Sequence, residues 1–226
     1  MGSHARILAT GATGSRARVR WEDMSVTKVS ITRAASALAV ALVLAVATAR
    51  GQGEPPAFDE NQEKLVSKDP AFTVTRPNKE WVFIDLERAK AKELRAHGYS
   101  AAEEAFKTLK ARLWHGGHPA DLFIHSWADN REDASSEKVG LEVLEQTNRA
   151  LKDAKVTGKG PTTLGKHKAF AFEIEGTFQG KPLAVSKVVV WREADKQTFV
   201  ISLECPKDRA KVARKDLAKL LKGIQL

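Results

Sequence analysis

The chain has 226 residues, with 37 Lys and Arg against 28 Asp and Glu, and a formal net charge of +9. This length allows one domain with a sizeable hydrophobic core. The first 49 residues hold six of the basic and two of the acidic side chains, so the remainder carries too small a positive excess to require nucleic-acid binding. The single cysteine, Cys205, excludes an internal disulfide.

Residues 7–16, ILATGATGSR, are similar to the start of a dinucleotide-binding domain. Gly11 and Gly14 occupy two of the three glycine positions of the phosphate-binding turn. That turn also needs an acidic residue about 20 positions further on to hold the ribose. No Asp or Glu occurs between Asp23 and Glu54, so the run does not predict a nicotinamide cofactor.

Residues 24–49 have the three-part layout of a secretory signal peptide. Lys28 and Arg33 form a basic leader, residues 34–47 are uncharged and mostly Ala, Val and Leu, and an A-x-A cleavage motif follows at 47–49. The apolar run, about 14 residues, is shorter than the roughly 20 needed to span a bilayer. We therefore expect a secreted or periplasmic protein with no stable membrane span after cleavage. Anchoring by an uncleaved segment is the alternative.

The signal peptide sets the expected domain boundaries. Residues 1–23 would be an upstream, non-native start region, with Met24 as the true start. Residues 50–69 are polar, contain two consecutive prolines, and predict a flexible linker. Residues 70–226 then form a single α+β domain with a helical insertion near 89–118.

The first elements of this domain are predicted to be a hairpin and a helix. Alternating apolar residues predict a strand around Phe72, and a turn at 77–79 joins it to a second strand at 81–86. In the insertion, Ser100 begins a capping box. The helical spacing of the apolar residues that follow predicts a helix with one apolar face, formed by Ala102, Phe106, Leu109 and Leu113.

The later elements predict an antiparallel meander. A strand at 121–128 and a helix at 136–154 come first, followed by a short strand and turn at 155–164. Three further strands lie between Lys168 and Cys205, joined by loops too short for a crossover, so they must be antiparallel. A last helix, capped by Asp208, closes the chain. The fold class is α+β, an antiparallel β-sheet meander covered by helices (an α/β sandwich).

This order resembles the PsbP-like family, whose fold is shared with a small nuclear-import factor that binds Ran. The resemblance rests on FTVTRPNKEWVF, DLFIHSWA, the helix at 136–154, LGKHKAFAFEIEG and QTFVISLECP, with Pro77, Trp81 and Gly165 as landmarks. It covers most of 70–226 and implies a secreted bacterial accessory or binding protein. The long segment at 89–118 departs from the family pattern.

Three histidines form the candidate metal site. His115 and His118 flank two glycines, and His125 lies in the next strand. A divalent metal such as zinc needs three or four N, S or O ligands, and Asp121 could be the fourth. Cys205 shares an apolar face and predicts a buried, inert thiol, so no catalytic residue and no bound organic cofactor are assigned. Trp114, beside the glycine loop, is the candidate partner-binding residue.

The sequence favours a secreted, non-enzymatic binding or accessory protein of PsbP-like type. Its partner would be an unidentified protein or envelope component, and not nucleic acid. A metal-binding protein that uses the histidine cluster is one alternative. An enzyme with a cleft beside the sheet is the other, and it requires a pocket of several hundred Å³ with convergent polar groups.

Overall fold

The computed structural model describes residues 58–97 and 106–226. The expected start region, the signal peptide, the first part of the linker and the capping box at Ser100 lie outside the described residues. None of the helices in the described ranges is both long and apolar enough to cross a membrane.

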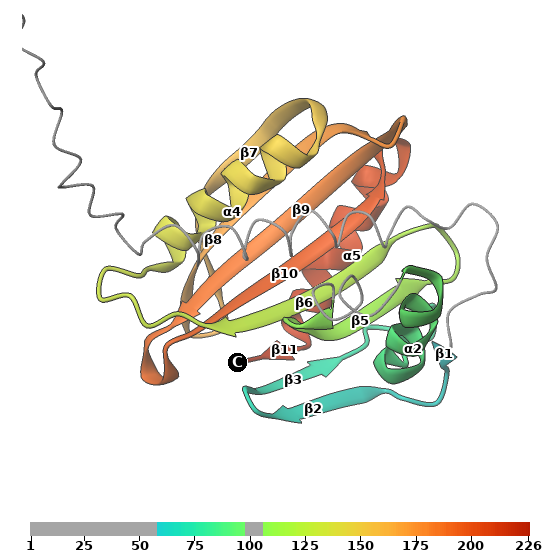
Figure 1. Ribbon diagram of the computed structural model, residues 1–226, viewed down its shortest axis with the longest axis horizontal. Coiled ribbons are helices and arrows are strands. Elements are labelled where there is room, and N and C mark those ends of the chain that lie inside the picture. The colour runs from blue at the N-terminus through green and yellow to red at the C-terminus, as the bar shows by residue number, and fades with distance from the viewer. Residues whose placement is uncertain (1–57, 98–105) are drawn as a thin grey trace, which may run out of the picture.

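The main sheet is antiparallel throughout and has eight strands in the order β1-β4-β5-β6-β10-β9-β8-β7 (Figure 1). The strands β7 to β10 follow one another in sequence and in space, which confirms the predicted meander and the α+β fold class. Their bounds, in sheet order, are Phe58–Asp59, Trp81–Ile84, Leu109–His115, Asp121–Ala128, Gln197–Pro206, Lys181–Arg192, His167–Phe178 and Lys152–Leu164.

A second, three-stranded sheet corrects the predicted hairpin. It has the order β11-β3-β2, with β2 at Lys64–Lys68, β3 at Ala71–Thr75 and β11 at Ile224–Gln225. Strand β3 pairs with β2 and β11, whereas β4 belongs to the main sheet. The segment predicted as a flexible linker therefore supplies β1 and β2. Alternation in β3 correctly indicated a strand, but it could not identify the partner strand.

The segment 89–118 is also different from the prediction. Helix α2 spans Leu86–His97, and Leu109 and Leu113 lie on strand β5 instead of a helix. Residues four apart share a face in a helix and in a strand alike, so the spacing did not distinguish the two. This segment forms a strand because β5 pairs with both β4 and β6, and that pairing buries Ala111 and Leu113.

Helices cover both faces of the main sheet (Figure 1). Helix α4, Ser136–Ala150, is capped by the Ser135 hydroxyl and packs on β7, β8 and β9. It approaches β8 closely because Gly140 has no side chain, and a Cβ there would lie 2.5 Å from the Phe170 ring. The helix ends at 150, before the expected 154, because β7 begins at Lys152.

Helix α5, Ala210–Lys222, packs on the opposite face together with the small sheet. A short 3₁₀ turn at Lys207–Arg209 precedes it, and Arg209 at the N-cap makes no side-chain capping bond, so Asp208 is not the predicted cap. The face under α4 continues across β10, β6 and β5. That part of the sheet carries the buried polar side chains considered next.

Candidate functional site

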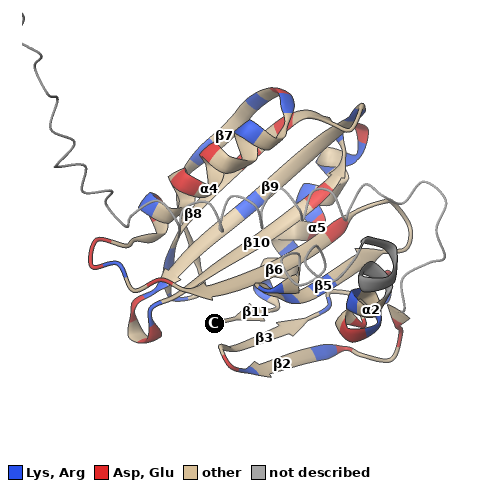
Figure 2. Cartoon of the chain, in the orientation of Figure 1, with Lys and Arg blue, Asp and Glu red and all other residues tan. Residues whose placement is uncertain are grey.

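Four charged side chains are buried on four adjacent strands of the main sheet. We call this set the charge row: Arg112 on β5, Asp121 on β6, Glu204 on β10 and Lys187 on β9, each at most 6% exposed. Asp121 lies directly opposite Glu204, and Lys187 lies opposite Ser202, one pleat away. In Figure 2, charged segments interrupt the otherwise uncharged middle of this sheet. Charged side chains are rarely buried unless they are paired or functional.

One end of the charge row is a closed ion pair. The Arg112 Nη2 lies 3.0 Å from the Asp121 Oδ1, and the Arg112 Nε donates to the same oxygen at 3.1 Å. The guanidinium also lies over the Phe123 ring, 5.0 Å from its centroid. Asp121 is therefore held by Arg112 and is not free to act as a metal ligand.

Glu204 is the incompletely bonded member. Its Oε1 accepts a hydrogen bond from the Ser202 hydroxyl at 3.3 Å, while its buried Oε2 has no hydrogen-bond partner within the described ranges. Burial raises the pKa of Glu204 to about 7, with Asp121 adding to the rise and Lys187 opposing it. A buried acceptor without a donor costs free energy, so Glu204 weakens the fold unless something else donates to it.

Lys187 is likewise a buried charged group whose charge is only partly compensated. Burial lowers its pKa to about 8, and the charge of Glu204 only partly opposes that change. Its ammonium makes no ion pair within 4.0 Å in the described part of the chain, so Glu204 and Lys187 attract each other across a gap. Buried charges in this arrangement seldom repay their desolvation.

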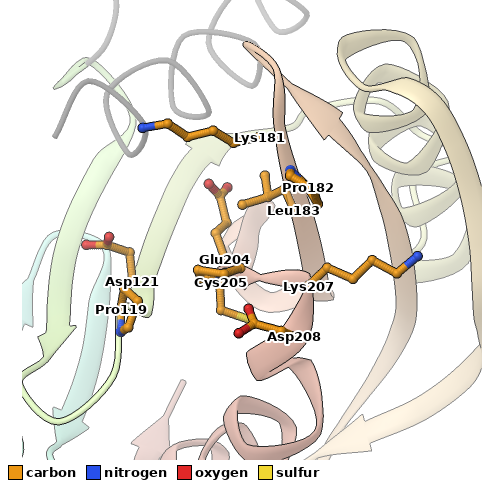
Figure 3. A pocket seen from close by; sticks show the side chains of 10 residues that line it. Pro119, Asp121, Lys181, Pro182, Leu183, Glu204, Cys205, Lys207 and Asp208 are labelled. Atoms are coloured by element: carbon orange, nitrogen blue, oxygen red, sulfur yellow. The ribbon is translucent and has the colours of Figure 1, made fainter. Parts of the chain in front are cut away.

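A cavity of about 780 Å³ opens at the end of the charge row (Figure 3). Its wall is mainly apolar and includes Pro119, Leu183, Cys205 and Pro206. Since Val185 lies opposite Glu204, the two-residue period of β9 places Leu183 and Lys181 on the same face as Glu204. Figure 3 shows the Glu204 carboxylate in this space and the Lys181 side chain extending across one side of it.

The thiol of Cys205 on the cavity wall is not a nucleophile. Cys205 is buried, and burial raises the pKa of its thiol to about 12. Nucleophilic cysteines need a lowered pKa and a nearby base. The predicted inert, buried cysteine agrees with this environment.

Two of the three predicted metal ligands come together, and the third does not. The His115 and His118 rings lie 3.7 Å apart, and their Nε2 atoms lie 3.9 and 3.7 Å from the Asp216 Oδ2. These three residues form the cluster with metal-ligand spacing, without His125. His125 is paired with Leu109 at the end of β5 that lies away from His115. It is therefore about 16 Å from His115 along the strand direction.

The hydrogen bonds of His115 do not suit a metal ligand. Its Nδ1 accepts from the backbone N–H groups of Gly117 and His118, both at 3.0 Å. The ring proton must therefore be on Nε2, the atom that faces Glu80 at 3.4 Å and Asp216. Metal-bound histidines instead donate from the second nitrogen.

We therefore expect zinc or manganese to leave the melting temperature of the purified protein unchanged. A ligand at His115 would have to break the two backbone hydrogen bonds to its Nδ1. Thermal unfolding with and without each metal measures this, with His118→Ala as the control. A rise of several degrees that His118→Ala abolishes would contradict the expectation and restore the metal-binding alternative.

His125 lies in the charge-row face instead. It is buried, and its Nδ1 lies 3.0 Å from the Thr108 hydroxyl. Burial, with the charge of Lys187 adding to it, lowers the pKa of His125 to about 3. The ring is therefore a neutral part of the interior.

Trp114 is half-buried, next to a second hollow of about 610 Å³. Its ring stacks on Phe58 at 5.2 Å between centroids. The hollow is lined by polar side chains, among them Glu60, Glu63 and Arg76. The role of Trp114 in partner binding stays a prediction.

Sequence reasoning missed the charge row. Alternation placed Phe199, Ile201, Leu203 and Cys205 on one face of β10 and gave no reason to select Glu204 on the other face. The available signal was one Glu and one Lys in the interior of two long, mostly apolar strands. Glu173 and Glu175 on β8 form ion pairs with Arg214 and Lys207.

Comparisons with known proteins find similarity to solved structures alone. No family model matches the chain. Comparison with curated proteins finds no relative. Similar solved structures include LpqN of Mycobacterium tuberculosis, involved in cell envelope biogenesis, at 14% identity and a TM-score of 0.46, over 77% of this chain and 86% of that chain.

Two further structures represent the proteins named by the sequence resemblance. Cyanobacterial PsbP of Synechocystis is similar at 9% identity and a TM-score of 0.47, over 78% of this chain and 96% of that chain. The Ran-binding protein Mog1p of Saccharomyces cerevisiae is similar at 11% identity and a TM-score of 0.42, over 73% of this chain and 95% of that chain. The likeness of this chain to the PsbP and Mog1 proteins is one of fold.

Proposed function

We propose that this protein is an exported, non-enzymatic binding protein that holds a small, largely apolar ligand in the cavity beside the charge row. The observation that carries the proposal is the buried Glu204 Oε2, which lacks a donor and belongs to the wall of a cavity of about 780 Å³. Cavities of this size with apolar walls and few polar groups are typical of ligand sites. Export rests on the signal-like segment at 24–49.

The composition of the wall favours binding over catalysis. The cavity meets the size that an enzyme would require, and a carboxyl group with a pKa near 7 could serve as a general base. However, Asp121 is held by Arg112, and the Cys205 thiol is protonated. The wall therefore offers Glu204 no nucleophile to activate.

The experiment is binding of N-phenyl-1-naphthylamine, whose fluorescence rises in an apolar site. We expect saturable binding to the purified protein and loss of binding in Leu183→Trp, because the larger side chain fills the cavity. Leu141→Trp is the matched control, since Leu141 is 42% exposed on α4, and it should bind as the wild type does.

The same measurement on a second variant keeps this proposal testable if Leu183→Trp does not fold. Lys181 is exposed and lines the cavity, so Lys181→Trp should fold and narrow the cavity at its mouth. The proposal fails if the probe does not bind to the wild type, or if both Trp variants bind it as tightly as the wild type does.

A further inference from the structure

This inference rests on the proposed function and concerns the chemistry of the ligand. The charges around the cavity largely cancel in pairs. Asp121 pairs with Arg112, Lys207 with Glu175 at 3.1 Å, and Asp208 with Arg209 at 3.6 Å. Among the described residues that line the cavity, these pairs leave Glu204 and Lys181 as the charges that a ligand could meet.

The deep end of the cavity requires a hydrogen-bond donor. The Glu204 Oε2 is buried and without a partner, and Glu204 is 2% exposed. An N–H or O–H group would satisfy it. A cationic donor is the poorer match, since Lys187 already faces Glu204 from β9, Arg112 lies beside Asp121 on β5, and Lys181 lines the same cavity.

The other end of the cavity favours a negative charge. Lys181 is exposed, forms no ion pair in the described part of the chain, and projects over the cavity from the face that carries Glu204. Val185, the residue opposite Glu204, lies four positions after Lys181 on β9, which is about 13 Å between Cα atoms. Glu204 and Lys181 both line the cavity, so a ligand that contacts both side chains needs about the length of a two-ring molecule with a short arm. Leu183 and Pro182 line the space between them.

We propose that the ligand is an apolar, ring-sized molecule with a neutral N–H or O–H donor for Glu204 at one end and an anionic group for Lys181 at the other. The donor lies in the deep end against the carboxylate, the apolar body contacts Leu183 and the prolines, and the anionic group remains at the mouth. The two ends contribute separately. Each can therefore be removed from the ligand or from the protein.

Four probes separate the two contributions by displacing N-phenyl-1-naphthylamine. Indole-3-acetate carries both groups, 3-methylindole only the N–H, 1-naphthaleneacetate only the carboxylate, and 1-methylnaphthalene neither. We expect indole-3-acetate to bind most tightly. Loss of the N–H should weaken binding about tenfold, since the acceptor is charged and buried, and loss of the carboxylate about threefold, since Lys181 is exposed.

The protein variants complete the test. Glu204→Leu should remove the advantage of the two indoles and leave that of the two acetates. Glu204→Gln, which keeps an acceptor oxygen, should retain part of the indole advantage. Lys181→Met should remove the advantage of the acetates alone, and Lys152→Met, an exposed lysine on β7, should change nothing.

Two outcomes would overturn the ligand class. One is equal binding of all four probes, and the other is an indole advantage that persists in Glu204→Leu. In both, continued binding of N-phenyl-1-naphthylamine would leave the proposed function standing. Absence of that binding is the separate failure of the proposed function itself.

Discussion

Replacing Lys187 and Glu204 together, as Lys187→Met with Glu204→Leu, is expected to raise the free energy of unfolding by about 1–4 kcal/mol, the gain typical when a buried charge pair gives way to apolar residues. Glu204 lacks a partner for one oxygen, and burial moves both pKa values towards neutrality. Both groups therefore hold their charges at a cost. Urea unfolding at pH 7 measures the change.

The single variants and a surface pair provide the comparison. Glu204→Leu alone should be less stable than the double variant, because it leaves Lys187 as an uncompensated buried charge. Arg149→Met with Glu145→Leu removes an exposed pair on α4 and should change stability by less than about 1 kcal/mol. Loss of stability in the Lys187/Glu204 double variant would mean that these charges support the fold, and the reason to assign them to a ligand would disappear.

Stability is expected to fall steeply with acid because of His125. Its folded pKa of about 3 lies below its ordinary value of 6.5. Between these two pH values, His125 is therefore protonated in the unfolded chain and neutral in the folded protein. Stability is fully present above pH 6.5 and is lost as the pH falls towards 3, at up to about 1.4 kcal/mol per pH unit.

The measurement is the free energy of unfolding of wild type and His125→Phe between pH 4 and 8. The difference between the two proteins isolates the contribution of His125 from that of Glu204. The raised pKa of Glu204 acts with the opposite sign, because its contribution to stability is present at low pH and is lost as the pH rises through 7. The variant should lose the part of the acid slope that His125 contributes, while that of His118, whose pKa burial also lowers, remains. His167→Gln, on β8, should keep the whole slope. An unchanged slope in His125→Phe would show that His125 is protonated in the folded state.

The C-terminal half of the fold was predictable because two local signals agree there. Apolar residues alternate in β8 and β10, and the turns between strands, such as Gln179-Gly180, are too short for a crossover. Gly180 has a positive φ of 79°, which glycine adopts without strain. Together these signals determine strands, direction and neighbours.

The N-terminal half was less predictable because its pairing is non-local. Strand β3 pairs with β11, about 150 residues later in the chain, and no local pattern encodes such a partner. Leu109 and Leu113 satisfied the helical and the strand period equally. Only the neighbouring strands β4 and β6 decide between them.

The candidate site illustrates the same limit. The sequence drew attention to histidines, since their spacing is visible along the chain. The charge row joins residues from 112 to 204 that only the register of four strands brings together. The sequence signal for such a site is a single charged residue in an apolar strand. This signal indicates a site only when the neighbouring strands also carry buried charged residues.

The most direct test of the proposed site is the titration of the Glu204 carboxyl group, followed by ¹³C NMR with and without saturating 3-methylindole. A buried acceptor that faces a ligand cavity predicts a pKa near 7 in the free protein and a lower pKa in the complex, because a donor on the ligand stabilises the carboxylate. A Glu204 that titrates in the ordinary range of glutamate, or is unaffected by the probe, would contradict the assignment of this cavity as the binding site.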